Sequence, residues 1–283
     1  MKNYLELLRP HQWLKNLMLL FPPFLGGVLF QIDSISALIL PLISFSVGAS
    51  AIYIVNDIMD IKQDAHHPQK RLRPLPSGKI NSSSALILAL ILGIFAVFSG
   101  LLVSGSFLFY LLAYLIISVT YSLWLKNIPV VEVFCVVSGF LLRLQAGGSA
   151  YNVKISDWLF LSVFLLALFL VSGKRLGELK HATGQSVKLI RPVLAKYPEG
   201  FFLGSLAMSG AAVLVTYTMY VISHHGNLLV IPLCCFGLLS YMMRVLSGKG
   251  GDPTRALLKD PALLIVGLAW VVLVGLDTYS HLG

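Results

Sequence analysis

Three aspartates and an asparagine stand directly after an uncharged apolar run in this sequence. Residues 56–64 read NDIMDIKQD. An α-helix turns by about 100° per residue, so Asp57, Asp60 and Asp64 fall within an arc of about 60°, and Asn56 widens it to about 100°. Three carboxylates on one helix face repel one another unless a cation neutralises them, and their hard oxygen atoms are the ligands that Mg²⁺ selects. The spacing therefore predicts a magnesium site formed by the three aspartates.

A second interpretation of the same stretch is a solvated helix end. In that case the carboxylates pair with Lys62 or with the basic residues that follow, and they need no metal. His66 and His67 are adjacent and cannot share one helix face, so we interpret them as loop residues rather than ligands.

The segment after the aspartates carries residues that bind phosphate. QKRLRPLPSGKI, residues 69–80, contains Lys70, Arg71, Arg73 and Lys79 among prolines and a glycine. A guanidinium group can hold two phosphate oxygens at once, and a loop stiffened by proline loses less entropy when it orders around a ligand. Such a charge run alone is typical of a solvated loop. Beside three clustered carboxylates, it indicates a site for a metal-bound diphosphate.

Arg143 interrupts the apolar segment VEVFCVVSGFLLRLQAGG, residues 131–148. An arginine inside a membrane segment is costly, so it marks a functional site by default. The alternatives are a side chain that snorkels to lipid headgroups and a pair with Glu132. Eleven residues separate the two positions, about 16 Å along one helix, which excludes direct pairing within that helix. We predict that Arg143 binds an anion.

Lys15 and Asn16 offer a second polar pair, next to Trp13 at the start of an apolar run. Tryptophan and lysine at that position are typical of a headgroup anchor. The same two side chains could instead hold a substrate phosphate, and the residues leave both roles open.

The elements that must position these side chains are membrane-spanning helices. The chain is 57% hydrophobic and only 12% charged over its 283 residues, far from a soluble average. Nine apolar windows are long enough to cross a bilayer, which predicts one integral-membrane domain over residues 1–283. The windows cover residues 14–31, 35–55, 83–104, 107–125, 129–149, 157–173, 201–223, 228–246 and 261–280.

The lysines and arginines predict the orientation. With the N-terminus in the cytoplasm, 19 of the 21 fall in cytoplasmic segments, while Lys154 is external and Arg143 is intramembrane. An odd number of spans then places the C-terminus outside. The net charge of +9 lies mostly on the cytoplasmic face. One interpretation is that these basic residues only set the topology and attract anionic lipid headgroups, and the other is that they bind a multiply charged anion. Neither interpretation involves nucleic acid.

Two of these patterns together resemble the UbiA superfamily of intramembrane prenyltransferases. They are N-D-x-x-D-x-x-x-D at the end of the second window and R-x-R-P-x-P-S-G after it. The resemblance implies an all-α fold of nine transmembrane helices around a central polar cavity, open to the cytoplasmic side. It also implies that Tyr121 and Lys126 line the pocket, although Tyr121 equally suits an aromatic at the membrane interface.

The superfamily's second acidic motif, D-x-x-x-D in the loop after the sixth span, is altered here. Residues 172–180 read SGKRLGELK, so that Glu178 is the one acid and Lys174 and Arg175 stand near the first aspartate position. Glu178 is spaced to pair with Lys174 at i,i+4. The altered charge predicts a different substrate from that of a prenyltransferase with two acidic clusters.

Further stretches resemble one branch, the decaprenyl-phosphate phosphoribosyltransferases. They are RPHQWLKNLMLLFPP at 9–23, YSLWLKNIPVVEV at 121–133, SGFLLRLQAGG at 138–148, SGKRLGEL at 172–179 and DPTRALLKDPAL at 252–263. That branch moves 5-phosphoribose from phosphoribosyl pyrophosphate to a polyprenyl phosphate and releases diphosphate. Lys174 and Arg175 could supply the positive charge that the extra 5-phosphate requires.

The resemblance implies a Mg²⁺-dependent enzyme in a bacterial inner membrane, with its active site facing the cytoplasm and a role in cell-wall precursor synthesis. The protein could also form a homo-oligomer. The first alternative is a prenyltransferase that uses a prenyl diphosphate and an aromatic acceptor. The second is a transporter or lipid-binding protein, which the clustering of charges at one end of the helices disfavours.

Overall fold

The chain is helical throughout its described part. A computed structural model describes residues 2–65, 70–181 and 191–280, and no residue within these ranges lies in a β-strand. The long helices are α3 (Ile35–Met59), α5 (Ser82–Val103), α6 (Gly105–Leu123), α7 (Val131–Ala150), α8 (Asp157–His181), α10 (Phe201–Ser223), α11 (Val230–Leu246) and α13 (Pro261–Ser280). The short α-helices are α1 (Lys2–Leu8), α2 (Phe21–Leu25), α4 (Ile61–Asp64) and α12 (Pro253–Lys259). The 3₁₀ segments are η1 (Pro10–Leu20), η2 (Leu29–Gln31), η3 (Lys70–Leu72), η4 (Leu125–Asn127) and η5 (Pro192–Lys196).

Seven described helices are long and apolar enough to cross a membrane, so the prediction of nine continuous α-helical spans is not confirmed. Two predicted spans account for the difference. Helix α11 has 17 residues and is shorter than the others, and the first window, 14–31, is divided among η1, α2 and η2. Proline lacks the N–H that an α-helix interior needs, which explains the break before Pro22 and Pro23. A 3₁₀ helix rises about 2.0 Å per residue, so η1 and α2 together still extend about 30 Å.

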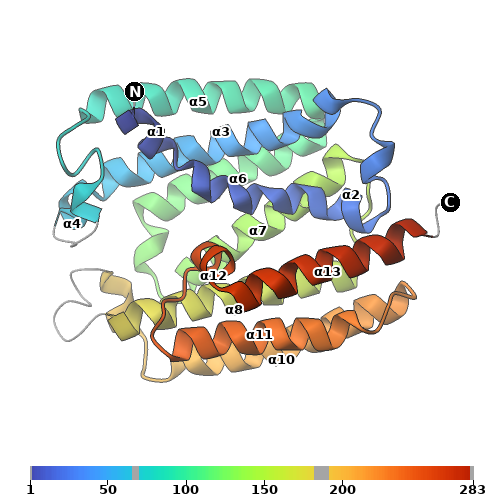
Figure 1. Cartoon of the computed structure of the whole chain (residues 1–283). Helices are drawn as coiled ribbons and strands as arrows, with labels where there is room; N and C mark the ends of the chain where they lie inside the picture. The colour runs from blue at the N-terminus through green and yellow to red at the C-terminus, as the bar shows by residue number, and fades with distance from the viewer. Residues whose placement is uncertain (1, 66–69, 182–190, 281–283) are drawn as a thin grey trace.

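Helix α7 lies between two groups of helices (Figure 1). Helices α1, α3, α5 and α6 form one group, and α8, α10, α11 and α13 form the other. One apolar cluster joins η1, α3 and α6 to α7 and includes Phe45 and Leu111. Another joins α7 to α8 and α10 and includes Val137 and Phe202. Helix α7 contributes to both clusters and carries two charged side chains of the site, Glu132 and Arg143.

Gly147 lets η1 pack directly on α7. A Cβ atom at this position would lie 2.2 Å from the backbone oxygen of Leu19. The close approach brings the η1 residue Asn16 within hydrogen-bond distance of Arg143 on α7. Glycine at residue 147 therefore helps to position the side chains of the site.

Replacing Gly147 by alanine is expected to destabilise the protein. The added methyl group would meet a backbone atom that cannot rotate away, and overpacking of this kind costs about 1–3 kcal/mol, or a fall of roughly 2–12 °C in the midpoint of thermal unfolding. Gly93→Ala on α5 is the matched control because a Cβ there meets nothing within 4 Å. Thermal unfolding in detergent measures both variants, and equal midpoints would show that the close packing is not needed.

The two acidic segments differ locally from their predictions. Helix α3 ends at Met59, Asp60 is its C-cap, and α4 begins at Ile61, so residues 56–64 do not form one uninterrupted helix. Residues 172–180 were expected in a loop; that prediction is wrong, because they form the last turns of α8. The stretch is rich in residues that favour a helix, which allows the span to continue past its apolar part.

Candidate active site

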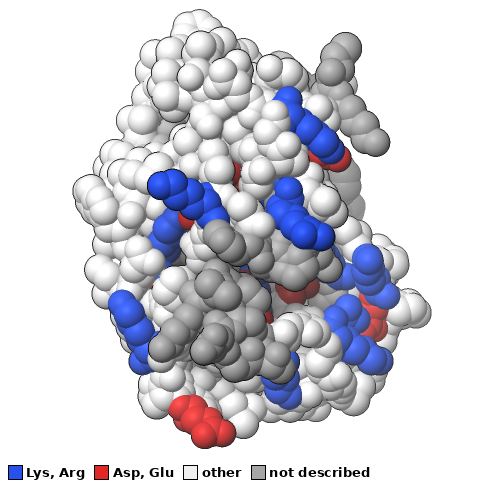
Figure 2. Space-filling view, turned by 90° about the vertical axis from the view of Figure 1, so that its left-hand side faces the viewer, with Lys and Arg blue, Asp and Glu red and all other residues white. Residues whose placement is uncertain are grey.

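A cavity of about 440 Å³ opens among η1, α3, α6, α7 and α8. The charged residues on its wall are Arg9, Lys15, Asp60, Asp64, Arg73, Lys126, Arg143, Lys174, Arg175, Glu178 and Arg191. Figure 2 views the end of the bundle that carries α4 in Figure 1. It shows Lys and Arg side chains spread around this face, with some acidic side chains in recesses between them and another exposed near the lower edge.

Asp57 and Asp64 converge on one guanidinium group. Asp57 is 2% exposed and forms ion pairs with Arg9 and with Arg73, whose Nη1 lies 3.3 Å from Asp57 Oδ1. The same Nη1 of Arg73 lies 2.7 Å from Asp64 Oδ2. A single positive nitrogen thus stands between two carboxylates that come from different helices.

Asp60 points to a different partner. Its Oδ1 accepts a hydrogen bond from Lys126 Nζ at 2.5 Å, and its Oδ2 accepts one from Asn56 Nδ2 at 2.9 Å. Within residues 2–65, 70–181 and 191–280, no three acidic, histidine or cysteine side chains are grouped closely enough to hold a metal. The predicted convergence of all three aspartates is therefore not seen, because the break at Asp60 turns this carboxylate toward Lys126 of η4.

The donor chemistry nevertheless suits a divalent ion with oxygen ligands. Asp57 and Asp64 already hold a cationic nitrogen between them, and the Asp60 carboxylate lines the same cavity. Carboxylate oxygens with room for water and phosphate are the ligands that Mg²⁺ takes in phosphate-transfer sites. These residues therefore fit a magnesium ion by chemistry, with Arg9 and Arg73 as the groups that neutralise Asp57 in this structure.

Three of the loop residues predicted to bind phosphate have side chains that the structure describes, namely Arg71, Arg73 and Lys79. Arg73 is the one of these three that lines the cavity. Arg71 and Lys79 are exposed and are not among the residues that line it. Pro74 and Leu75 are buried, which anchors the loop directly after Arg73 and turns that side chain inward. His66 and His67 lie outside the described residues, as do residues 68 and 69, which join them to η3.

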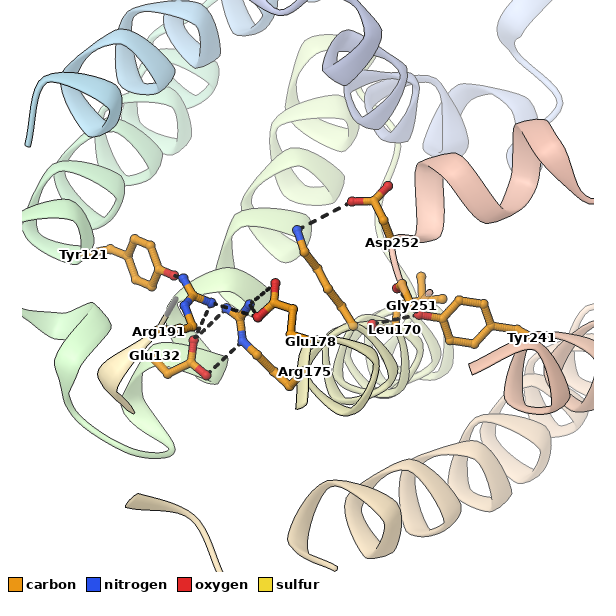
Figure 3. Close-up of polar contacts among 10 residues, drawn as sticks. Tyr121, Glu132, Leu170, Arg175, Glu178, Arg191, Tyr241, Gly251 and Asp252 are labelled. Carbon is orange, nitrogen blue, oxygen red and sulfur yellow. Dashed lines mark hydrogen bonds and ion pairs between the residues drawn. The ribbon is translucent and has the colours of Figure 1, made fainter. Parts of the chain in front are cut away.

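The altered motif on α8 forms a network of buried ion pairs (Figure 3). Arg175, 3% exposed, donates to both carboxylate oxygens of Glu132 on α7, at 3.0 and 2.7 Å, and to Glu178 at 3.0 and 3.2 Å. The Glu178 carboxylate pairs with Arg175 at i,i+3, and the predicted pair with Lys174 is wrong. Lys174 Nζ instead lies 3.5 Å from Asp252.

Arg191 completes this network from the segment before η5. Its Nη2 donates to Tyr121 Oη at 2.7 Å, and its Nη1 lies 3.7 Å from both Glu132 and Glu178. Two arginines face two glutamates, so the charges cancel. The hypothesis that Arg175 supplies net positive charge to the cavity is therefore wrong, because its charge is balanced by carboxylates contributed by two helices.

Arg143 is a buried cation with neutral partners. It is 5% exposed, and its guanidinium donates to Asn16 Oδ1, the Gly139 carbonyl and Tyr114 Oη at 2.7, 2.7 and 3.1 Å. Its Cζ also lies 4.5 Å from the centre of the Tyr114 ring, a cation–π distance. Among the described residues Arg143 forms no ion pair, so its charge remains uncompensated beside the cavity. A buried charge of this kind is stabilised by an anionic ligand.

Lys15 and Asn16 have different roles. Lys15 lines the cavity and makes no hydrogen bond or ion pair within the described part of the chain. Asn16 is buried, does not line the cavity, and is held by Ser46 at 3.0 Å while it accepts from Arg143. The structure thus places Lys15 where it can contact a ligand and makes Asn16 a positioning residue for Arg143.

Asp252 forms an ion pair with Lys174, which lines the cavity. Its carboxylate caps α12 by accepting from the Arg255 backbone N–H at 3.0 Å. Burial alone would raise the pKa of Asp252, but Lys174 and the capping bond more than offset this, so the pKa is below its ordinary value. The loop is held against α8 by Tyr241, whose hydroxyl donates to the Gly251 carbonyl at 2.6 Å.

Several residues of this site were not predicted to belong to it. Arg9, Tyr114, Glu132, Arg191 and Asp252 all contact its charged groups. Glu132 carried a usable signal, since an acid inside an apolar helix needs a cation from another helix. The other four give no such local signal, because their partners lie far away in sequence.

An apolar helical bundle that encloses a charged cavity defines an integral-membrane protein with an internal site for polar groups. The chain belongs to the UbiA prenyltransferase family, whose family model matches residues 20–260. It is 31% identical to decaprenyl-phosphate phosphoribosyltransferase of Mycobacterium tuberculosis over 95% of this chain and 91% of that one. It is 32% identical to the protein of the same name from Corynebacterium glutamicum, over 97% of this chain and 86% of that one.

The fold agrees with a solved member of this family. A UbiA homologue from Archaeoglobus fulgidus, in a structure with GPP and Mg²⁺ bound, superposes with a TM-score of 0.76 and covers 98% of this chain and 99% of its own. The sequence identity is 22%, so this likeness supports the fold and not the substrate.

Proposed function

We propose that the protein transfers 5-phosphoribose from phosphoribosyl pyrophosphate to a polyprenyl phosphate and releases diphosphate. The observation that carries the proposal is the uneven charge along the cavity wall. The aspartates are balanced by Arg9, Arg73 and Lys126, whereas Arg143 and Lys15 form no ion pair with an acidic side chain among the described residues. Two polar regions of this kind suit two anionic substrates. The names of the relatives from Mycobacterium tuberculosis and Corynebacterium glutamicum support the same reaction.

The donor's diphosphate would bind at the aspartate end of the cavity. Asp57, Asp60 and Asp64 would hold Mg²⁺, which neutralises the charge that builds on the diphosphate leaving group. Arg73 and Lys126 line the same region and can donate to phosphate oxygens. The Mg²⁺ in the Archaeoglobus fulgidus homologue supports the use of a divalent ion.

The acceptor is itself an anion, so it needs positioning more than activation. A phosphate monoester is already ionised at neutral pH and needs no dedicated general base. Arg143 and Lys15 would hold the phosphate against the repulsion of the donor. Asn16 and Tyr114 fix the direction of the Arg143 side chain through hydrogen bonds.

Residues 1–283 would act as one membrane domain with its N-terminus and active site in the cytoplasm and its C-terminus outside. The support is the distribution of charge, since 19 of 21 lysines and arginines fall on one side in this orientation. The η1–α2 segment and α11 would complete nine membrane crossings. A bacterial inner membrane and a role in cell-wall precursor synthesis are part of the proposal.

A prenyltransferase that uses a prenyl diphosphate and an aromatic acceptor is the second candidate, since the family as a whole carries that name. The ion pairs of Glu132 and Glu178 disfavour this candidate, because both carboxylates are already paired with Arg175 and Arg191. They therefore do not offer a second acidic cluster for a metal.

The two functions can be separated by exchanging substrates. The purified protein in phospholipid nanodiscs, with Mg²⁺, is given ribose-labelled phosphoribosyl pyrophosphate and a polyprenyl phosphate. We expect the label in the lipid phase, and no product from a prenyl diphosphate with 4-hydroxybenzoate. A prenylated aromatic, with no labelled lipid, would contradict the proposal and support the second candidate.

A further inference from the structure

Ser50 on α3 has a buried hydroxyl group with three partners. The side chain is 1% exposed, and its oxygen accepts a hydrogen bond from Trp13 Nε1 at 2.9 Å. The hydroxyl lies 2.8 Å from the Leu8 carbonyl and 2.9 Å from the Ser46 carbonyl, and its one proton serves both acceptors. A bond to the carbonyl four residues earlier is ordinary for a serine inside a helix. The other two bonds tie both ends of residues 8–13 to α3.

Arg9 lies between these two ties in a strained conformation. Its backbone has φ 51° and ψ 58°, in the left-handed region. A residue with a side chain pays conformational free energy there and keeps the conformation only where its surroundings impose it. On one side of Arg9, the buried Leu7 packs in the cluster that contains Ile54 and Leu75. On the other side, the Ser50 hydroxyl holds the chain, so the turn is fixed at both ends.

The strained turn directs the Arg9 side chain to the aspartate end of the cavity. Ser50 and Asp57 are seven residues apart on α3, about two turns, so they share a helix face. The Arg9 guanidinium pairs with Asp57, and its Cζ lies 5.4 Å from the centre of the Tyr53 ring. Arg9 lines the cavity, whereas Ser50 is not among the residues of its wall. The Ser50 hydroxyl therefore fixes a cavity cation without touching the cavity itself.

We infer that Ser50 is a positioning residue, which acts on the transfer reaction through Arg9. The inference rests on the proposed function, in which the donor's diphosphate binds at the aspartate end of the cavity. A flexible side chain binds a ligand more tightly when its direction is set beforehand, because less conformational freedom is lost on binding. Without the Ser50 hydroxyl, the Leu8 carbonyl and the Trp13 indole lose their shared partner. The turn can then leave the left-handed region, and the Arg9 guanidinium is no longer held in place.

Hydrogen–deuterium exchange tests whether Ser50 holds the turn. Ser44→Ala is the matched control for Ser50→Ala, because Ser44 is also buried on α3 but bonds Ser99 of α5 at 2.8 Å. In nanodiscs without substrate, we expect faster amide exchange over residues 2–13 in Ser50→Ala and no such change in Ser44→Ala. Unchanged exchange in Ser50→Ala would overturn the inference. So would a rise spread equally over all the long helices, because it would make the hydroxyl a general stabiliser of the fold.

Steady-state kinetics test the route through Arg9. We expect Ser50→Ala to raise KM for phosphoribosyl pyrophosphate by about tenfold, equivalent to about 1.4 kcal/mol. KM for the polyprenyl phosphate should not change, because Arg143 is held by other residues. Ser44→Ala should leave both values as they are. An equal rise in both values for Ser50→Ala would contradict a role confined to the donor.

A double-mutant cycle gives the sharpest version of this test. If Ser50 acts through Arg9, Ser50→Ala in an Arg9→Gln background should not raise the donor's KM further. A full additional tenfold rise would show that Ser50 acts independently of Arg9 and would overturn the inference. If the wild-type protein transfers nothing, the proposed function fails, while the exchange experiment still decides whether Ser50 holds the Arg9 turn.

Discussion

Asp57→Asn is expected to lower phosphoribosyl transfer by about 10²–10³-fold, because it removes one of the carboxylates proposed to hold the Mg²⁺ that neutralises the leaving diphosphate. Asparagine has nearly the same size and can still accept a hydrogen bond from Arg9. Arg73 keeps its pair with Asp64 at 2.7 Å. The loss should therefore appear in the reaction rate at saturating Mg²⁺, with little change in the midpoint of thermal unfolding.

The matched control is Asp33→Asn, at an exposed position in the segment before α3. This variant should keep wild-type rates, because the exposed Asp33 carboxylate forms no ion pair with the cations of the cavity, whereas Asp57 pairs with Arg9 and Arg73. Normal turnover by Asp57→Asn would exclude a metal-binding role for this aspartate. A joint loss of activity and thermal stability would instead make Asp57 a structural anchor for Arg9 and Arg73.

Arg143→Gln is expected to abolish most transfer while it leaves the fold intact. The buried guanidinium has no acidic partner among the described residues, so its removal leaves no unpaired carboxylate. Glutamine can still donate to Asn16. Loss of the proposed buried, charge-assisted contact to the acceptor phosphate would cost about 2–5 kcal/mol, or roughly 30- to 5,000-fold in kcat/KM.

Arg175→Gln provides the opposite result and is the control. Removing the Arg175 guanidinium group leaves the fully buried Glu132 without its main partner. A broken buried ion pair costs about 3–5 kcal/mol of stability. We therefore expect a clear fall in the unfolding midpoint for Arg175→Gln and a small one for Arg143→Gln. Thermal unfolding in detergent and acceptor-dependent kinetics measure the two effects. If Arg143→Gln were the less stable variant, or kept its activity, the anion-binding assignment would be wrong.

The sequence is informative where function depends on local spacing. Most hydrophobic windows locate the long helices to within a few residues, as the match between window 201–223 and α10 shows, whereas α8 continues eight residues beyond window 157–173. Arg143 was identifiable because a charge in an apolar segment stands out against its own helix. Asp57 and Asp64 were expected to point to one place, and they do share Arg73.

The pairing of charges could not be predicted from local spacing. The i,i+4 rule joins Lys174 to Glu178, but it considers one helix alone. In the structure Glu132 on α7 holds Arg175, and Asp252 on a distant loop holds Lys174. The balance of charge in the cavity therefore depends on which helices are neighbours. Hydropathy also does not predict that the first apolar window, 14–31, is divided into η1, α2 and η2 at Pro22 and Pro23.

The most direct measurement follows the phosphorus atoms of the donor. Phosphoribosyl pyrophosphate is labelled with radioactive phosphorus in either its 5-phosphate or its terminal diphosphate position and is incubated with the protein, Mg²⁺ and a polyprenyl phosphate. Transfer of phosphoribose predicts that the 5-phosphate label enters the lipid phase and that the diphosphate label stays in water. Diphosphate label in the lipid, or neither label there, would contradict the account.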